Sequence, residues 1–280
     1  MQTYYDCYPC ILRQAIEATR MTGATTEQTR YIIQQTLETL KHIHDGATPP
    51  EIGARVHELV RQMVGSDDPY LSVKREATDK ALGMVADLQQ IIDDSDDPFL
   101  TALRISIAGN IMDFGPNPAY DLWGVVMRVL KQAPALDETQ ALRESLDHVD
   151  SVLFIADNAG ETVFDRLFIE QIPKPVTYAV RGGPVINDAT VEDAIRADID
   201  KVAEIIDTGV RFPGVVLSES SPEFQERFKS APLILAKGMG NYETLSDVTA
   251  PIYFLFQVKC PIVGKDVGAG VGDIIISRHT

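Results

Sequence analysis

The residues most able to do chemistry in this chain stand where an apolar segment ends. Residues 152–156 read Val-Leu-Phe-Ile-Ala, and Asp157 and Asn158 follow directly, ahead of Gly160 and Glu161. Ligands of open α/β sheets bind at the carboxyl ends of strands. Hard oxygen ligands at such an end, before a turn with free backbone N–H groups, suit a divalent cation that holds a phosphate. We therefore expect a metal- and phosphate-binding site here.

A second acid, Asp188, follows another apolar segment, residues 176–180. If the two segments are neighbouring parallel strands, both loops emerge at one edge of the sheet. Asp157, the amide oxygen of Asn158 and Asp188 could then share one ion, and oxygen-only ligation favours Mg, Mn or a similar hard cation over zinc. The competing interpretation is that the two aspartates only cap the helices that follow. Two such acids at strand ends, one of them beside Asn158, favour the metal-binding interpretation over helix capping.

A third strand-end loop begins at Lys237, directly after residues 233–236. The sequence from Lys237 to Glu243 reads Lys-Gly-Met-Gly-Asn-Tyr-Glu and includes Asn241. A lysine beside glycines that allow close backbone approach suits an anionic oxygen. The alternative is a plain turn with Lys237 in solvent. The position at a third strand end favours the functional interpretation.

The chain has three cysteines, Cys7, Cys10 and Cys260. The C-x-x-C spacing of the first two suits a metal or a redox pair. A closed structural zinc site needs four ligands, however, and only three thiols exist. The alternative is that all three are small buried apolar residues. An odd number of cysteines does not predict a disulfide framework.

Gly109 and Asn110 interrupt an apolar helical stretch. Both residue types are poor helix formers, and such a local conflict is expected where a function demands it. We expect Asn110 or Asp113 to reach a cleft between the two halves of the chain. The alternative is an ordinary helix end before Pro116.

Secondary-structure elements must position these residues. The hydrophobic pattern of the sequence changes near residue 148. Apolar residues recur at three- and four-residue steps before that point, which predicts roughly six to eight helices. Short apolar segments then alternate with helical ones, which predicts a mainly parallel sheet between helical layers. The expected strands are residues 152–156, 176–180, 201–206, 233–236 and 252–258, with 273–277 as an edge strand. The expected helices between them are residues 162–170, 191–197 and 223–230.

The predicted fold is therefore of the α/β class. A helical bundle, residues 1–148, packs on a Rossmann-like three-layer α/β domain, residues 149–280, that holds the metal and phosphate. The 280 residues suffice for one large or two modest domains.

The composition excludes several classes of protein. The net charge is −16, from 41 acids and 25 bases, which argues against nucleic acid as a partner. No apolar run approaches the roughly 20 residues that span a bilayer, and no basic-then-apolar leader opens the chain. We expect a cytoplasmic protein without a membrane partner. The sequence leaves the oligomeric state open.

Together these motifs resemble the damage-control metal-dependent phosphatases, the domain of unknown function 89, in their compact prokaryotic branch with an N-terminal C-x-x-C. The resemblance runs in order over nearly the whole chain. It is carried by Cys7-Tyr8-Pro9-Cys10, Asp68-Pro69-Tyr70 with Lys74, Gly109-Asn110, Asp157-Asn158-Ala159-Gly160-Glu161, Asn187-Asp188, Lys237-Gly238-Met239-Gly240-Asn241-Tyr242-Glu243 and Cys260.

The resemblance implies hydrolysis of phosphate monoesters of small metabolites, such as sugar phosphates or damaged phosphometabolites. It implies a divalent ion, Mg, Mn, Co or Ni, held by Asp157, Asn158 and Asp188, with Lys237 on the phosphate. The remaining candidate contacts to the substrate come from the same motifs. They are Gly160, Glu161, Asn110, Asn241 and Glu243.

Two other functions compete with the phosphatase. One is a carboxyl methyltransferase that uses S-adenosylmethionine, but residues 157–160 match its glycine-rich loop poorly. The other is a non-enzymatic metal or redox protein that uses Cys7, Cys10 and Cys260. Within the phosphatase hypothesis, the attacking group is either water or the carboxylate of Asp157. Asn158 and Ala159 stand where aspartyl-phosphate enzymes carry an Asp-x-Asp pattern, which favours water.

Overall fold

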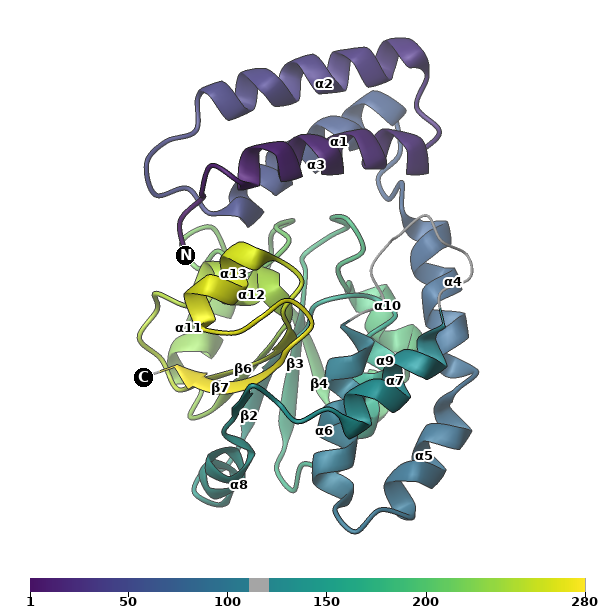
Figure 1. Ribbon diagram of the computed structural model, residues 1–280, viewed down its shortest axis with the longest axis vertical. Helices are drawn as coiled ribbons and strands as arrows, with labels where there is room; N and C mark the ends of the chain where they lie inside the picture. Colours follow the sequence, from purple (N-terminus) through teal and green to yellow (C-terminus); the bar gives the residue numbers. More distant parts are fainter. Residues whose placement is uncertain (111–120, 280) are drawn as a thin grey trace.

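A seven-stranded sheet forms the centre of the protein, in the order β1-β7-β6-β5-β2-β3-β4 (Figure 1). The computed structural model describes residues 1–110 and 121–279, so Asp113 lies outside the described residues. Strands β2 to β6 are parallel to one another, and β7 runs antiparallel to β6. The strands are β1 (Leu136–Asp137), β2 (Val152–Ile155), β3 (Val176–Val180), β4 (Glu204–Asp207), β5 (Ile234–Lys237), β6 (Ile252–Gln257) and β7 (Ile274–His279).

Helices cover both faces of the sheet, and side chains alternate between the two layers. Phe154 of β2 packs in one core with Phe164 and Phe168 of α9 (Thr162–Ile169). Its neighbours in β2, Leu153 and Ile155, pack in a second core on the opposite face. Strand side chains point alternately to opposite faces, so one apolar run supplies both cores. The prediction of an α/β fold with a mainly parallel sheet is thus confirmed.

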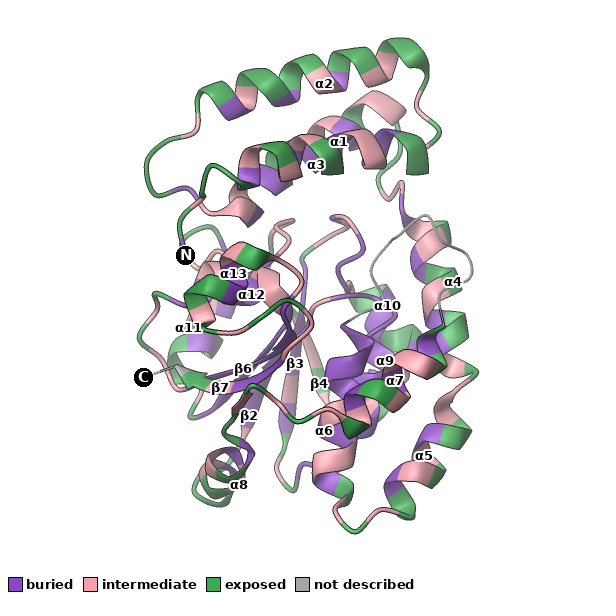
Figure 2. Cartoon of the chain, viewed as in Figure 1, coloured by how far each residue is buried: buried purple, intermediate pink, exposed green. Residues whose placement is uncertain are grey.

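The first face is covered by α9 with α10 (Val191–Arg196), α6 (Pro98–Gly109) and α5 (Val85–Asp93), and the second by α11 (Pro222–Ser230), α12 (Gly238–Leu245) and α13 (Pro261–Val267). Buried residues concentrate in the sheet, α6 and α9 (Figure 2).

Three N-terminal helices form a separate layer with a core of its own. These helices are α1 (Cys7–Met21), α2 (Thr26–Lys41) and α3 (Pro49–Val64). Thr25 and Thr48 begin α2 and α3 with capping boxes, which satisfy backbone N–H groups that a helix start leaves unpaired. The layer lies across one end of the sheet (Figure 1). The helical half also holds α4 (Leu71–Leu82), α7 (Leu122–Lys131) and α8 (Thr139–Asp147).

The two halves of the chain share structure across residue 148. Strand β1 comes from the helical half and pairs with β7, and α6 packs closely on α9. Lys74 of α4 is 1% exposed, and its Nζ is 2.8 Å from Asp68 Oδ2 and 2.7 Å from Asp193 Oδ2. This buried ion triplet fastens α4 to α10. The domain boundary at residues 148 and 149 stays a prediction.

Some elements differ from the sequence-based expectation. The last strand, β7, is not at an edge, because the two-residue β1 pairs with its outer side. A strand so short leaves no periodic signal. Helices α12 and α13 were not predicted, since α12 opens with Gly-Met-Gly and α13 leads into a glycine-rich segment. No helix in the described residues is long and apolar enough to cross a membrane. The cytoplasmic location stays a prediction.

Candidate active site

The loops after β2 and β3 pair with each other at the carboxyl edge of the sheet. The strands are neighbours, with Ile155 opposite Ala179. Beyond them, Asn158 and Asp188 form an isolated antiparallel bridge. The Ala159 N–H donates to Asn187 O at 2.8 Å, and the Ala189 N–H to Asp157 O at 2.8 Å. The backbone therefore brings Asp157, Asn158 and Asp188 together.

The carboxylate of Asp157 is held by two side-chain amides. Asn110 Nδ2 donates to Asp157 Oδ2 at 2.7 Å, and Asn158 Nδ2 donates to the same oxygen at 2.9 Å. Asn110 ends α6 and is fully buried. Its Oδ1 has no partner within residues 1–110 and 121–279. The Gly109–Asn110 interruption thus delivers an amide from the helical half to the strand edge.

Behind Asp157 lies a buried ionic cluster centred on Lys237. The ammonium donates to Glu161 Oε1 at 2.7 Å, Asp165 Oδ1 at 2.7 Å and Ser106 O at 3.0 Å. Lys237, Glu161 and Asp165 are all fully buried. Glu161 Oε2 also accepts from Asn158 Nδ2 at 3.0 Å. In this structure, all three protons of Lys237 are directed to protein acceptors, so its predicted contact with phosphate stays a prediction.

Asp188 is paired with Arg181, which follows β3. Arg181 Nε donates to Asp188 Oδ2 at 2.7 Å, and Arg181 Nη2 donates to Asn241 Oδ1 at 3.2 Å. Asn241 Nδ2 donates to Ala156 O at 2.9 Å and Lys237 O at 2.7 Å. Asn241, a predicted substrate contact, is therefore buried and ties the ends of β2, β3 and β5 together.

Negative charge is in excess at this edge of the sheet. Burial, with Glu161 and Asp188 nearby, raises the pKa of Asp157 well above its usual range. Burial raises the pKa of Asp188 to about 6, although Arg181 opposes the shift. Burial alone would lower the pKa of Lys237, but Asp165 and Glu161 outweigh it and raise that pKa. A cation at the two aspartates would relieve the crowding of charge.

The donor set suits a hard divalent cation. Asp157 and Asp188 offer carboxylate oxygens, Asn158 an amide oxygen, and such ligands favour Mg or Mn over zinc. The pKa values of both carboxyls are raised mainly because burial disfavours their charged forms, and a bound cation would favour those forms. The residues present therefore fit the implied ion.

The start of α12 lies directly against Asp157. Gly238 has φ +78°, and a Cβ placed there would lie 2.0 Å from Asp157 Oδ2. Only glycine allows this approach, because it tolerates the left-handed region and has no side chain. A helix start carries unpaired backbone N–H groups. The Lys-Gly-Met-Gly motif therefore places a helix N-terminus beside the candidate metal ligands.

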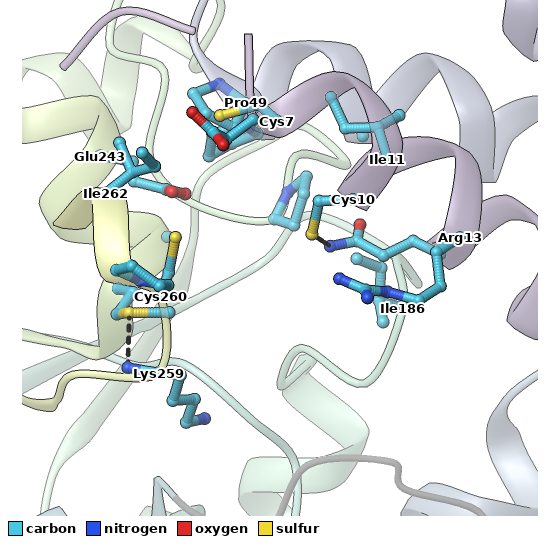
Figure 3. A pocket seen from close by; sticks show the side chains of 18 residues that line it. Cys7, Cys10, Ile11, Arg13, Pro49, Ile186, Glu243, Lys259, Cys260 and Ile262 are labelled. Carbon is cyan, nitrogen blue, oxygen red and sulfur yellow. Dashed lines mark hydrogen bonds between the residues drawn. The ribbon is translucent and has the colours of Figure 1, made fainter. Parts of the chain in front are cut away.

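A cavity of about 350 Å³ opens beside this edge, between α1, α3 and the starts of α12 and α13. Glu243, Met239 and Gly240 line it, and Ile186 enters it from the loop that carries Asp188 (Figure 3). Burial raises the pKa of Glu243 to about 7. Gly160 is buried in the turn before α9, away from the cavity lining. Of the predicted substrate contacts, Glu243 alone lines this cavity.

The three cysteines line the same cavity (Figure 3). All are free thiols; Cys7 is buried, while Cys10 and Cys260 are partly exposed. Across the described parts of the chain, no group of three or more His, Cys, Asp or Glu side chains is arranged to hold a metal ion. The structure therefore gives no support to a closed metal site made of these thiols.

Two cationic side chains at the site, Arg181 and Lys259, were not identified from the sequence. Arg181 follows β3 directly and is 1% exposed, and its Nη1 has no partner among the described residues. Lys259 follows β6, lines the cavity and lowers the pKa of Asp157 by its charge. Both follow strands, so the criterion that selected Lys237, a position at a strand end, also applies to them.

The fold and this edge define an α/β protein that gathers acidic, amide and cationic side chains at the carboxyl ends of parallel strands. The model of the damage-control phosphatase ARMT1-like domain matches residues 3–275. The chain belongs to this family. The sequence-based predictions of the family and of a phosphomonoester hydrolase are confirmed.

Similar proteins cover the whole chain or nearly all of it. An uncharacterized protein of Methanocaldococcus jannaschii is 35% identical over 290 residues, 98% of this chain and 94% of that protein. A damage-control phosphatase of Pyrococcus horikoshii is 34% identical over 287 residues, 100% and 99% of the two chains. The crystal structure of a DUF89 family protein from Pyrococcus horikoshii matches with a TM-score of 0.91 and 32% identity over 100% of both chains.

Proposed function

We propose that the protein is a divalent-metal-dependent phosphatase that hydrolyses phosphate monoesters of small metabolites, such as sugar phosphates or damaged phosphometabolites. The observation that carries the proposal is the bridge between Asn158 and Asp188. It joins two strand-end loops so that the oxygens of Asp157, Asn158 and Asp188 can serve one ion. Family membership supports the phosphatase activity, and the oxygen-rich donor set supports the cation.

Asp157, Asn158 and Asp188 are the residues that would hold Mg, Mn, Co or Ni. When bound, such an ion neutralises charge on the phosphoryl group and activates water. Asn110 and Asn158 fix the Asp157 carboxylate through two hydrogen bonds to one oxygen. This restraint suits a ligand that keeps one position. We therefore favour water over Asp157 as the attacking group.

The phosphate would lie between these ligands and the start of α12. The helix N-terminus offers backbone N–H groups to an anion, and Gly238 lets it approach Asp157. Lys259, whose charge reaches Asp157, adds a cation from the end of β6. Lys237 would hold Glu161 and Asp165 behind the site, and a direct contact with the phosphate would require it to leave one of its acceptors.

The leaving group would occupy the cavity beside α12. Its volume of about 350 Å³ is at the small end of ligand pockets, which suits a metabolite rather than a polymer. Its lining combines apolar side chains with Arg13, Gln14 and Glu243, which could hydrogen-bond a hydroxylated leaving group.

Phosphate release from metal-stripped protein, with Mg, Mn, Co or Ni restored singly, tests the proposal on a panel of sugar and cofactor phosphates. Asp157→Ala should lower release by more than about 100-fold, because loss of even an outer partner of a metal site costs 10–100-fold. Asp207→Ala is the matched control, since Asp207 ends β4 outside the site. Release that needs no ion, or that survives in Asp157→Ala, would contradict the proposal.

A further inference from the structure

All three cysteines of the chain converge on one cavity although they are far apart in sequence. Cys7 and Cys10 come from α1, and Cys260 precedes α13 on the facing wall (Figure 3). The cavity also contains Met239 and Gly240 of the motif that faces Asp157. Three nucleophilic side chains thus share a solvent-connected space next to the candidate active site.

Cys7 and Cys10 have the spacing at which two cysteines of one helix can be brought together. Cys7 is the first residue of α1, and Cys10 is one turn later on the same helix. Residues three apart on a helix are neighbours, with Cβ atoms about 5–6 Å apart. A disulfide needs Cβ atoms about 3.5–4.5 Å apart, so the first turn must adjust to form one, and C-x-x-C motifs occur in redox proteins.

The two thiols differ in access and environment. Cys10 is partly exposed and accepts a hydrogen bond from Gln14 Nε2 at 3.6 Å. Cys7 is buried, and burial raises the pKa of its thiol, as does the charge of Glu243. Because the more accessible thiol reacts first with an external reagent, Cys10 would attack and Cys7 would complete the exchange.

We propose that Cys7 and Cys10 form a thiol–disulfide exchange site that reacts with low-molecular-weight disulfides entering the cavity. The Cys10 thiolate attacks one sulfur of the reagent, forms a mixed disulfide and releases one reagent thiolate. Cys7 then attacks Cys10 sulfur, forms the Cys7–Cys10 disulfide and releases the second. The protons of the two cysteines pass to these leaving thiolates. The protein thiols are oxidised, and one reagent disulfide is reduced to two thiols.

This exchange would regulate the phosphatase, a part of the inference that rests on the proposed function. The mixed disulfide places a substituent in the leaving-group cavity, and the internal disulfide moves Cys10 out of its wall. Both changes act on the binding of the leaving group and leave Asp157 and Asp188 in place. Oxidation should therefore raise KM severalfold and change kcat little.

The first experiment treats the native protein with hydroxyethyl disulfide and maps its thiols by mass spectrometry. The expected product has lost two hydrogens, carries a Cys7–Cys10 link and returns to dithiol with dithiothreitol. Cys7→Ser should stop at a mixed disulfide on Cys10. Cys260→Ser is the matched control and should still form the link. Thiols that react only after unfolding, a link to Cys260, or stoichiometric zinc on the purified protein would overturn the proposal.

Activity assays on the same samples test the regulation separately. Each variant is compared with its own reduced form, with metal present. A severalfold rise in KM on oxidation, reversed by dithiothreitol, supports the regulatory role, and an unchanged KM in fully linked protein overturns it. If reduced protein releases no phosphate with any ion while the link still forms, the proposed function fails and the exchange site stands.

Discussion

Lys237 Nζ and Glu161 Oε1 lie 2.7 Å apart inside the protein, with neither side chain exposed to solvent. The pair joins the end of β5 to the start of α9, and Asp165 at 2.7 Å makes it a triplet. A lysine that the sequence places at a strand end thus supports the candidate site from behind. In this geometry Lys237 stabilises the buried carboxylates, which is a different role from a direct contact with phosphate.

Replacing Lys237 with methionine should destabilise the fold by about 3–5 kcal/mol, because two buried carboxylates lose their cation. Urea unfolding measures the change, with Lys265→Met as the control, since Lys265 is exposed on α13. A Lys237→Met protein that keeps wild-type stability but releases no phosphate would instead support a direct contact between Lys237 and the phosphate.

Gly238→Ala should weaken binding of the divalent ion. The new methyl group would lie 2.0 Å from Asp157 Oδ2, so the carboxylate must move. Titration of metal-stripped protein with Mn should show a loss of affinity of about tenfold or more. Gly268→Ala is a matched control, because its φ of +75° imposes the same backbone cost, about 1–2 kcal/mol, with no atom within 4 Å. Equal Mn affinity in the two variants would contradict the assignment of Asp157 as a ligand.

Gly109→Ala should destabilise the contact between α6 and α9. Its Cβ would lie 2.5 Å from Phe164 Cδ2 and 3.0 Å from Glu161 Cγ. Overpacking of this kind costs about 1–3 kcal/mol, which thermal unfolding can measure. Gly83→Ala is the control at another helix end, where the Cβ meets nothing closer than 3.4 Å. A destabilisation no greater than that of the control would show that α6 and α9 can move apart at little energetic cost, contrary to this prediction.

The sequence predicted the parts of the site that depend on strand order. The apolar segment 152–156 ends within one residue of β2, and segment 176–180 matches β3. The meeting of Asn158 and Asp188 follows from the rule that neighbouring parallel strands end at one edge. Local pattern was sufficient there, because the two loops are fixed by the strands that precede them.

The individual side-chain contacts behind the site could not be predicted. Lys237 lies two residues after Leu235 in β5, so alternation places it on the face covered by α9 and α6. No local pattern shows that Glu161 and Asp165 lie next to it. Asn110 was expected to reach a cleft between the halves, but no local pattern shows that its partner there is Asp157, 47 residues away. Such pairings depend on how α9 and α6 pack on the sheet, which is a property of three-dimensional packing rather than of periodicity.

Glu243→Gln should make stability less sensitive to pH. Burial raises the pKa of Glu243 to about 7 in the folded protein, against 4.5 as its ordinary value. Between these two values the folded state retains a proton that the unfolded state has lost, so this group destabilises the fold as pH rises from 4.5 through 7. The full loss is on the order of 3 kcal/mol, and the glutamine variant should not show it.

The measurement is the free energy of unfolding by urea at intervals between pH 5 and pH 8, in wild type and variant. Their difference isolates Glu243 from the other buried acids, because those acids titrate in both proteins. The free energy of unfolding of the variant, relative to that of the wild type, should rise steadily with pH and level off above pH 7. Glu219→Gln, at an exposed position, should run parallel to the wild type. A Glu243→Gln curve that also runs parallel would show that this carboxyl is solvated in the cavity and ionises as an ordinary glutamate.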